Sequence, residues 1–520
     1  MAALAGDLAA AGYTAEHLRE RWGAAADGAL GRGHALPARR ALTAGALASG
    51  APSSGADADD PLAVIALLFG LGQPAPLDAV ASAFPRTGVG GLENLNLIRS
   101  RATGIVHPLV LLRPQSFIDD EGAGQWWIAS DLDEAALGGA LPEDHVLGVG
   151  GASLTLAGLQ LTSPVARVLD LGSGCGIQAL RALRVADRVV ATDRSERALA
   201  FTRFNDVLNT VLNNEAGSAS DARIQTRAGD LFDPVRGDLF DRVVSNPPFV
   251  ITPREGGVPA YEYRDGGRVG DALVAEVVSG VGTVLVPGGT AQLLGNWESR
   301  DGVDGLDRVR AWVAQSPVPM DAWVIERERM DPVSYAELWI RDGGTVPGTP
   351  EYDRLLGAWL DDFAARGVSA IGFGYVLLRR AVGTPTLARY ERVTHAVPES
   401  GLGEALTRAL AAHDTLQNLD DRALGTQALV VAPDVTEARH FLPGADDPSV
   451  IELRQGGGFA RTIAVDPALA ALVGACDGEL TVGQIIAAIA ELMDADEQAL
   501  HAELLPHVRA LVVDGFLALP

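Results

Sequence analysis

The segment Val243–Phe249, with the sequence VVSNPPF, combines an amide side chain, two prolines and an aromatic ring at the end of an apolar run. The prolines remove two backbone N–H donors and fix two φ angles, so the loop is stiff and poor in donors. What remains is the Asn246 side chain, backbone carbonyls and the ring of Phe249. Such a corner suits a planar NH2 group, because its hydrogens need acceptors and its face can stack on a ring. The segment therefore predicts chemistry on a nitrogen atom.

A glycine-rich turn precedes this segment and runs from Asp170 to Gly176 as DLGSGCG. It follows an apolar run and opens a helical pattern, and side chains at Gly172, Gly174 or Gly176 would block the close approach of a ligand to the backbone. The acidic Asp170 can face an ammonium group but not a pyrophosphate. The G-x-G-x-G spacing also differs from the G-x-G-x-x-G of dinucleotide sites. The turn therefore indicates a cofactor site other than one for NAD.

Two further predicted strands end in polar groups. Asp193 ends the strand after the glycine turn, within the sequence ATDRS, where a carboxylate can accept from ribose hydroxyls. Gly229, Asp230 and Leu231 end the third strand, at a position suited to an adenine amino group and ring. These strand ends and the glycine turn are expected to build one site.

These residues must be positioned by a fold of the α/β class. Between about residues 148 and 380 strands alternate with helices, which predicts a mainly parallel sheet covered on both faces. Val165–Leu171 is the first buried strand, and Val368–Arg379 is a final long strand that we expect to run antiparallel at or near an edge. The expected domains are residues 1–145, mostly helical; 146–383, the α/β domain; and 384–520, an acidic α+β domain. A winged-helix-like unit is one arrangement open to both outer domains.

The α/β region resembles the class I S-adenosylmethionine-dependent methyltransferases. The run Asn246-Pro247-Pro248-Phe249 resembles the branch that methylates amide or exocyclic amine nitrogens. Within that branch the chain is similar to release-factor glutamine methyltransferases and to rRNA guanine-N2 small-domain methyltransferases, over about residues 150–380. The resemblance implies a Rossmann-like, seven-stranded sheet and S-adenosyl-L-methionine as the cofactor. The Pro-Arg-x-Glu-type stretch of bacterial release-factor enzymes is absent, so Ser153 and Thr155 are the candidates for closing over the cofactor.

The resemblance also implies roles for individual residues. The residues expected to hold the cofactor are Asp170, Gly172, Gly174 and Gly176 at the methionine end, Asp193 at the ribose, and Asp230 with Leu231 at the adenine. Independently of the resemblance, the loop after the proline-rich segment is aromatic, charged and hinged by glycines, as a loop that covers a substrate would be. The residues expected to contact the methyl acceptor beside the catalytic ones are Pro248, Tyr261, Tyr263 and Arg264.

Catalysis is expected from Asn246, Pro247 and Phe249. A delocalised lone pair makes an amide or aromatic amine a poor nucleophile. Accepting both N–H bonds, through the Asn246 side-chain oxygen and the Pro247 carbonyl, would draw the nitrogen toward sp³ and stabilise its developing charge. Phe249 would stack on the planar group. No strong base is required, which agrees with the lack of histidine near the motif.

The net charge and the cysteine content limit which binding partners and which cellular location we expect. The net charge of −26 disfavours approach to polyanions, which argues against DNA and favours a protein or small molecule over RNA. Cys175 and Cys476 lack metal-like spacing, so we expect no metal site and no disulfide framework, and a reducing, cytoplasmic location. The sequence has no apolar run of about 18 residues and no signal-like start, which predicts no membrane span.

The methyl acceptor stays open at this point. A protein side chain, above all glutamine in a translation factor, fits the acidic composition. An RNA nucleobase, methylated at guanine N2 or adenine N6, is the alternative, since a flipped base suits such a pocket. A cofactor-binding scaffold without activity is a third hypothesis, against which the intact Asn246 and glycine turn argue. The sequence does not set the oligomeric state.

Overall fold

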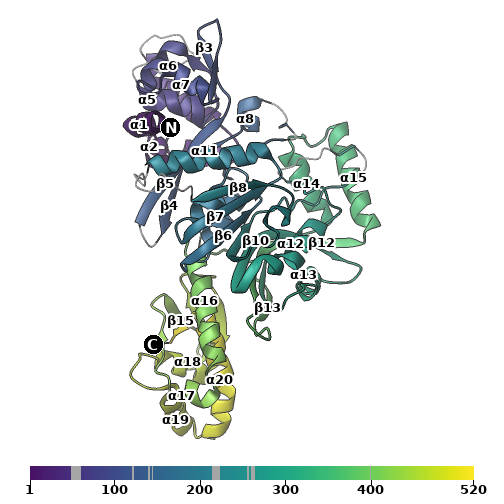
Figure 1. The fold of residues 1–520 in the computed structure, drawn as a ribbon. Coiled ribbons are helices and arrows are strands. Elements are labelled where there is room, and N and C mark those ends of the chain that lie inside the picture. Colours follow the sequence, from purple (N-terminus) through teal and green to yellow (C-terminus); the bar gives the residue numbers. More distant parts are fainter. Residues whose placement is uncertain are drawn as a thin grey trace. The chain divides into compact units, whose positions relative to one another are not determined.

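The structure is a computed structural model of the 520-residue chain (Figure 1). It describes residues 1–48, 60–119, 122–138, 141–142, 144–212, 223–254, 257–258, 264–398 and 400–519. By its internal contacts the chain divides into two compact units, one of Met1–Leu154 with Val165–Glu391 and one of Thr155–Pro164 with Arg392–Pro520. The expected three-domain division stays a prediction. Within the described residues, every helix is too short or too polar to pass through a bilayer.

The amino-terminal part of the first unit is mostly helical, and some of its helices begin at a side-chain cap. The Thr14 hydroxyl accepts from the N–H of His17 in α2, and the Asp60 carboxylate accepts from that of Ala63 in α5. The helices are α1 (Ala2–Ala10), α2 (Ala15–Trp22), α3 (Ala24–Leu30), α4 (Leu36–Ala48), α5 (Pro61–Ile65), α6 (Leu77–Ala83), α7 (Gly88–Asn94) and α8 (Glu134–Leu137), with a π-helical turn at Ala66–Gly70. The strands are β1 (Ala75–Pro76), β2 (Ile98–Ser100), β3 (Ile105–Pro108), β4 (Leu111–Asp119) and β5 (Gly122–Ser130).

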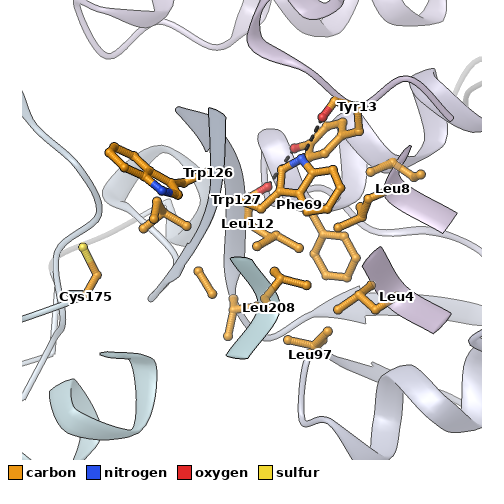
Figure 2. Close-up of a cluster of buried hydrophobic side chains, with 14 of the residues drawn as sticks. Leu4, Leu8, Tyr13, Phe69, Leu97, Leu112, Trp126, Trp127, Cys175 and Leu208 are labelled. Atoms are coloured by element: carbon orange, nitrogen blue, oxygen red, sulfur yellow. Dashed lines mark hydrogen bonds between the residues drawn. The ribbon is translucent and has the colours of Figure 1, made fainter. Parts of the chain in front are cut away.

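A hydrophobic core joins this helical part to the rest of the first unit (Figure 2). Within it, the buried Tyr13 hydroxyl donates to the Leu112 carbonyl, and Trp127 Nε1 donates to the Tyr13 carbonyl, each over 2.8 Å. These bonds satisfy polar atoms that burial would otherwise leave unpaired. Leu208, from the α/β part, lies in the same cluster.

Two asparagines of α11 (Glu196–Leu212) hold β5 against the α/β part. The Asn205 side chain accepts from the Ala129 N–H over 2.8 Å and donates to the Ala129 carbonyl over 3.0 Å. Asn209 makes the same pair of bonds to the backbone of Trp127, at 2.8 and 3.0 Å. Asn205 Nδ2 also donates to the Cys175 carbonyl over 2.8 Å. The amino-terminal part therefore supports the glycine-rich turn through buried amide hydrogen bonds.

The central sheet has eight strands in the order β13-β11-β12-β10-β9-β6-β7-β8. Neighbours from β8 to β10 run parallel, whereas β12 runs antiparallel to both β10 and β11. The strands are β6 (Val165–Leu171), β7 (Ala186–Asp193), β8 (Ile224–Ala228), β9 (Phe240–Ser245), β10 (Leu285–Arg300), β11 (Met320–Met330), β12 (Val368–Arg380) and β13 (Ala388–Arg392). The expected Rossmann-like α/β fold is confirmed, with β13 added to the expected seven strands.

The last long strand, β12, is antiparallel as predicted. It lies near one end of the sheet as the third of the eight strands, between β10 and β11. Its residues are buried along most of its length, as a strand bonded on both sides requires. The chain then returns as β13, which takes the edge position beyond β11.

Neighbouring residues of the inner strands pack on opposite faces of the sheet. Val168 and Val244 belong to the core shared with the amino-terminal part, whereas Leu169 and Val243 belong to a second core on the other face. This alternation is the period-two pattern of a strand covered on both sides. The remaining helices of the α/β part are α9 (Gly151–Leu159), α10 (Ile177–Ala182), α12 (Ala272–Gly280), α13 (Gly305–Ala314), α14 (Pro332–Asp342) and α15 (Pro350–Ala365).

The strand register brings the expected site residues to one edge. Leu171 at the end of β6 pairs with Thr192 in β7 on one side and with Ser245 in β9 on the other. Asp193 pairs with Ala228, directly before Gly229. The carboxyl ends of these strands therefore lie level, and the chain leaves β6 and β9 at the point where the strand order reverses, which is where α/β folds bind ligands.

The second unit is an α+β unit with its own core. Two of its helices begin at side-chain caps, because the Thr481 hydroxyl accepts from the Gln484 N–H and the Asp496 carboxylate from the Ala499 N–H. Its helices are α16 (Leu402–Gln417), α17 (Asp421–Gly425), α18 (Pro467–Gly474), α19 (Val482–Met493) and α20 (Glu497–Val513). Its strands are β14 (Val430–Val431), β15 (Val435–Phe441), β16 (Pro448–Gln455), β17 (Thr462–Val465) and β18 (Leu517–Ala518).

Candidate functional site

A cavity of about 210 Å³ opens at the carboxyl ends of β6, β7, β8 and β9. It lies within the first unit. The expected site residues that line it are Gly172, Gly174, Asp193, Asp230, Leu231, Asn246, Pro247 and Pro248. The fold therefore brings the glycine turn, two strand-end carboxylates and the proline-rich loop around one space.

The glycine turn offers open backbone to the cavity. Gly172 and Gly174 have φ angles of 78° and 53°, which disfavour any residue with a Cβ. A Cβ added at either position would meet no atom within 4 Å, so it would project into free space that a ligand could fill. Gly176 differs, because it does not line the cavity and a Cβ there would lie 3.0 Å from the Thr202 side chain. Gly176 thus allows α11 to pack closely, rather than a ligand.

Asp170 lies beneath the turn and does not line the cavity. It is 0% exposed, and its Oδ2 accepts from the Ala179 N–H in α10 over 3.0 Å. Its Oδ1 is buried and has no hydrogen-bond partner among the described residues. Burial raises the pKa of Asp170 to about 8. This position lets Asp170 hold the glycine turn against α10. It does not bring the carboxylate to the cavity, so the expected contact with the ammonium group of a ligand stays a prediction.

Asp193 lines the cavity and also ties together the loops beside it. Its Oδ2 accepts from the Gly174 N–H and its Oδ1 from the Ser195 N–H, each over 2.9 Å. A carboxylate oxygen has a second lone pair, so both oxygens can still accept from a ligand hydroxyl. The position agrees with the ribose role expected for Asp193, and it adds a structural role that the sequence did not indicate.

The third strand end presents Asp230 and Leu231 to the cavity. The Asp230 carboxylate is about half exposed and lies 3.7 Å from the Arg268 guanidinium. Leu231 has a φ of 45°, in the left-handed region that a branched side chain rarely adopts. Such a conformation costs about 1–3 kcal/mol and is typical of ligand sites. The backbone at Leu231 is therefore held in a form that local preference does not favour.

Asn246 is the polar side chain of the proline-rich loop that faces the cavity. Its Nδ2 donates to the Ser153 hydroxyl oxygen over 3.4 Å. Its Oδ1 is buried and has no hydrogen-bond partner among the described residues. An unsatisfied buried acceptor costs about 1–3 kcal/mol, and a hydrogen bond from a bound ligand would offset that cost. Pro247 and Pro248 line the cavity next to it.

Phe249 and Arg264 do not line the cavity. The Phe249 ring centroid lies 5.4 Å from that of Phe373, so its stacking on an acceptor stays a prediction. Arg264 is 8% exposed, and its Nη1 donates to the Asp342 carboxylate over 2.8 Å and to the Trp339 carbonyl over 3.3 Å. The structure therefore engages Arg264 within the protein instead of bringing it to the site.

The remaining expected acceptor contacts, Tyr261 and Tyr263, lie outside the described residues. Nothing in the structure bears on them.

Three further polar residues line the cavity, namely His145, Ser153 and Gln178. His145 is 4% exposed, and burial lowers its pKa. The sequence around the proline-rich loop holds no histidine, so its proximity arises only from the fold. Ser153 was one of two candidates upstream of the first strand, and the other, Thr155, does not line the cavity. For His145 and Gln178 the sequence carries no signal that would have identified them.

Comparisons with known proteins support the assignment of this region. Residues 150–257 match a family model described as methyltransferase small domain. Residues 10–108 and 410–519 match two further models, each described as a domain of unknown function. The predicted resemblance is therefore confirmed for the segment that contains the glycine turn and the proline-rich loop.

The chain is also similar to individual relatives. It is 35% identical to the release factor glutamine methyltransferase of Caulobacter vibrioides over 27% of this chain and 49% of that protein, so it spans about half of that relative's length. It is 28% identical to the release factor glutamine methyltransferase of Moorella thermoacetica over 41% of this chain and 83% of that protein. Among solved structures, a methyltransferase from Pyrococcus furiosus is 16% identical over 43% of this chain and 78% of that chain, with a TM-score of 0.25.

Proposed function

We propose that this chain transfers a methyl group from S-adenosyl-L-methionine to a planar amide or exocyclic amine nitrogen, on the ground that residues 150–257 match the model of the methyltransferase small domain family. The observation that carries the proposal is Asn246, which lines the cavity beside the glycine turn and whose buried Oδ1 has no hydrogen-bond partner among the described residues. An oxygen in that position accepts an N–H bond from the reacting nitrogen.

The residues of the cavity fit this cofactor. Gly172 and Gly174 leave free space beside an open backbone, which suits the methionine end. Asp193 lines the cavity with a carboxylate, the kind of group that accepts from ribose hydroxyls, and Leu231 supplies an apolar surface for the adenine ring. The bound cofactor supplies an electrophilic methyl group on a sulfonium. The part of the protein is to bind it and to orient the acceptor nitrogen in line with that group.

Asn246 and Pro247 act on the acceptor nitrogen. The Asn246 Oδ1 and the Pro247 carbonyl accept its two N–H bonds, which localises the lone pair and stabilises the positive charge that develops during transfer. Asn246 Oδ1 is already desolvated, so little reorganisation is needed when the acceptor binds. The proton that the nitrogen then loses passes to solvent, and no strong base is required.

The acceptor that we propose is a glutamine side chain of a translation factor. Two observations support it: the relatives named above are release factor glutamine methyltransferases, and the chain carries a net charge of −26. A strongly acidic chain has no general electrostatic attraction to nucleic acid. Methylation of an RNA base at guanine N2 or adenine N6 would use the same two hydrogen-bond acceptors of the site. The labelling experiment below distinguishes an RNA substrate from a protein substrate.

The test is transfer from labelled cofactor to a cell extract by the full chain and by the Asn246→Ala variant. Loss of one transition-state acceptor should lower kcat by about 10²–10³-fold, with cofactor affinity within a few-fold. Asn296→Ala is the matched control, because Asn296, within β10, also has a buried Oδ1 without a hydrogen-bond partner among the described residues, but it does not line the cavity. Unchanged turnover in Asn246→Ala, or an equal loss in Asn296→Ala, contradicts the assigned role.

The same assay identifies the acceptor. Label in a band that protease removes supports a protein, and label that nuclease removes supports RNA in its place. Tight cofactor binding without transfer to either fraction would mean a binding scaffold and would overturn the enzymatic proposal.

A further inference from the structure

We propose that Ser153 is a positioning residue that sets the orientation of the Asn246 amide, and this inference rests on the proposed function. Ser153 lies in the first turn of α9 and lines the cavity opposite the proline-rich loop. Its hydroxyl oxygen accepts from Asn246 Nδ2 over 3.4 Å. Residues 153 and 246 are far apart in the sequence, so this contact exists only because of the fold.

The orientation of Asn246 decides what its amide can do. The side-chain torsion of asparagine is roughly two-fold, so rotation by half a turn exchanges the oxygen and the NH2 group at little intrinsic cost. With Oδ1 in the cavity, the amide accepts an N–H bond from the acceptor. With Nδ2 in the cavity, the amide presents a hydrogen-bond donor to the NH2 group of the acceptor, which is itself a donor. Productive chemistry therefore requires that one of the two orientations be held.

Asn246 Oδ1 has no hydrogen-bond partner among the described residues, so nothing on that side holds the amide before an acceptor binds. The hydrogen bond from Nδ2 to the Ser153 hydroxyl oxygen is a contact that the Asn246 side chain does make. It holds the amide plane at Ser153 in the orientation that the structure contains, with the NH2 group toward the serine oxygen. A hydrogen bond of this kind contributes about 0.5–1.5 kcal/mol, which is enough to restrict a side-chain torsion that is otherwise broad.

Ser153 is itself held in place by the helix that follows the glycine turn. The Ser153 carbonyl accepts from Gln178 Nε2 over 2.7 Å, and Gln178 is 3% exposed in α10. Gln178 lies two residues after Gly176, so the element that begins at the cofactor turn also fixes the first turn of α9. The two halves of the site, one for the cofactor and one for the acceptor, are in this way joined through Ser153.

The test compares Ser153→Ala, Ser153→Thr and Thr155→Ala in the full chain, with methyl transfer as the readout. Ser153→Ala removes the oxygen, and we expect kcat to fall about tenfold, which corresponds to one hydrogen bond of the strength given above. The KM for S-adenosyl-L-methionine should stay within about twofold. Ser153→Thr keeps a hydroxyl and should restore most of kcat. Thr155→Ala removes a hydroxyl from the same helix outside the cavity lining and should leave both constants unchanged.

A double-mutant cycle separates positioning from a general effect on the fold. In the Asn246→Ala background there is no amide to orient, so Ser153→Ala should lower single-turnover transfer no further. Additive losses, or a fall in kcat that Ser153→Thr does not reverse, would overturn the positioning role. If Asn246→Ala itself leaves kcat unchanged, the proposed function fails. If it lowers kcat while Ser153→Ala does not, only the positioning role fails.

Discussion

The buried carboxyl group of Asp170 should make the stability of the first unit depend on pH, and Asp170→Asn should remove that dependence. Asp170 is 0% exposed, and burial raises its pKa from 3.8 to about 8. A group whose pKa is higher in the folded than in the unfolded state binds its proton more tightly when folded. Its stabilising contribution is therefore complete below about pH 4 and is lost as the pH rises toward 8.

The magnitude follows from the size of the shift. Between the two pKa values the free energy of unfolding falls by at most about 1.4 kcal/mol for each pH unit. Asparagine is neutral at every pH, has the same shape as the protonated acid, and its oxygen can accept the Ala179 N–H as Asp170 does. The stability of Asp170→Asn relative to wild type should therefore rise by at most about 2.5 kcal/mol from pH 5 to pH 7. For a unit of about 380 residues, with an unfolding entropy of about 2.1 cal/mol/K per residue, this corresponds to a difference in Tm of at most about 3 °C.

Thermal unfolding of both proteins at pH 5, 6, 7 and 8, followed by circular dichroism at one ionic strength, measures this difference. The difference between variant and wild type cancels the titration of groups that do not interact with residue 170. A variant that gains stability relative to wild type with each step in pH supports a buried neutral acid. Parallel Tm curves for the two proteins would show that the carboxylate is ionised throughout, and would refute the reasoning.

Two further substitutions test the other polar positions of the site. Asp193→Ala should weaken cofactor binding in calorimetry and also lower the Tm, because the Gly174 and Ser195 N–H groups lose their acceptor at a cost of about 1–3 kcal/mol each. Unchanged affinity would count against the ribose role. Arg264→Gln should lower the Tm, since it breaks a buried bond to Asp342, while leaving the KM for the methyl acceptor unchanged. A raised KM at an unchanged Tm would instead return Arg264 to the acceptor site.

The proline-rich loop and the glycine turn could be predicted from the sequence because their geometry is largely local. Two consecutive prolines restrict the backbone of residues 246–248 wherever the loop lies, and positive φ angles at Gly172 and Gly174 are possible because these residues lack a Cβ. Alternating strands and helices then dictate that the ends of parallel strands meet at one edge. The expected residues on those ends, such as Asp193 and Asn246, accordingly line one cavity.

The sequence was less informative where a residue's role depends on its neighbours in space. Asp170 is the acidic residue that opens the glycine turn. Only the fold shows that its carboxyl group is buried against α10 rather than exposed to a ligand. Arg264 follows an aromatic loop that suggested a substrate contact, yet its guanidinium is occupied by Asp342. Burial and pairing of a charge are set by surrounding elements, and local sequence does not report them.

What the sequence alone determined is the α/β fold class, from the alternation of strands and helices, and the local geometry of the glycine turn and the proline-rich loop, from backbone restrictions within a few consecutive residues. Tertiary structure alone decided that β12 enters between β10 and β11, that His145 and Gln178 reach the cavity, and that Ser153 contacts Asn246. Those outcomes depend on packing between segments that are distant in the chain, where the burial of apolar faces and the pairing of polar atoms are settled by the whole unit.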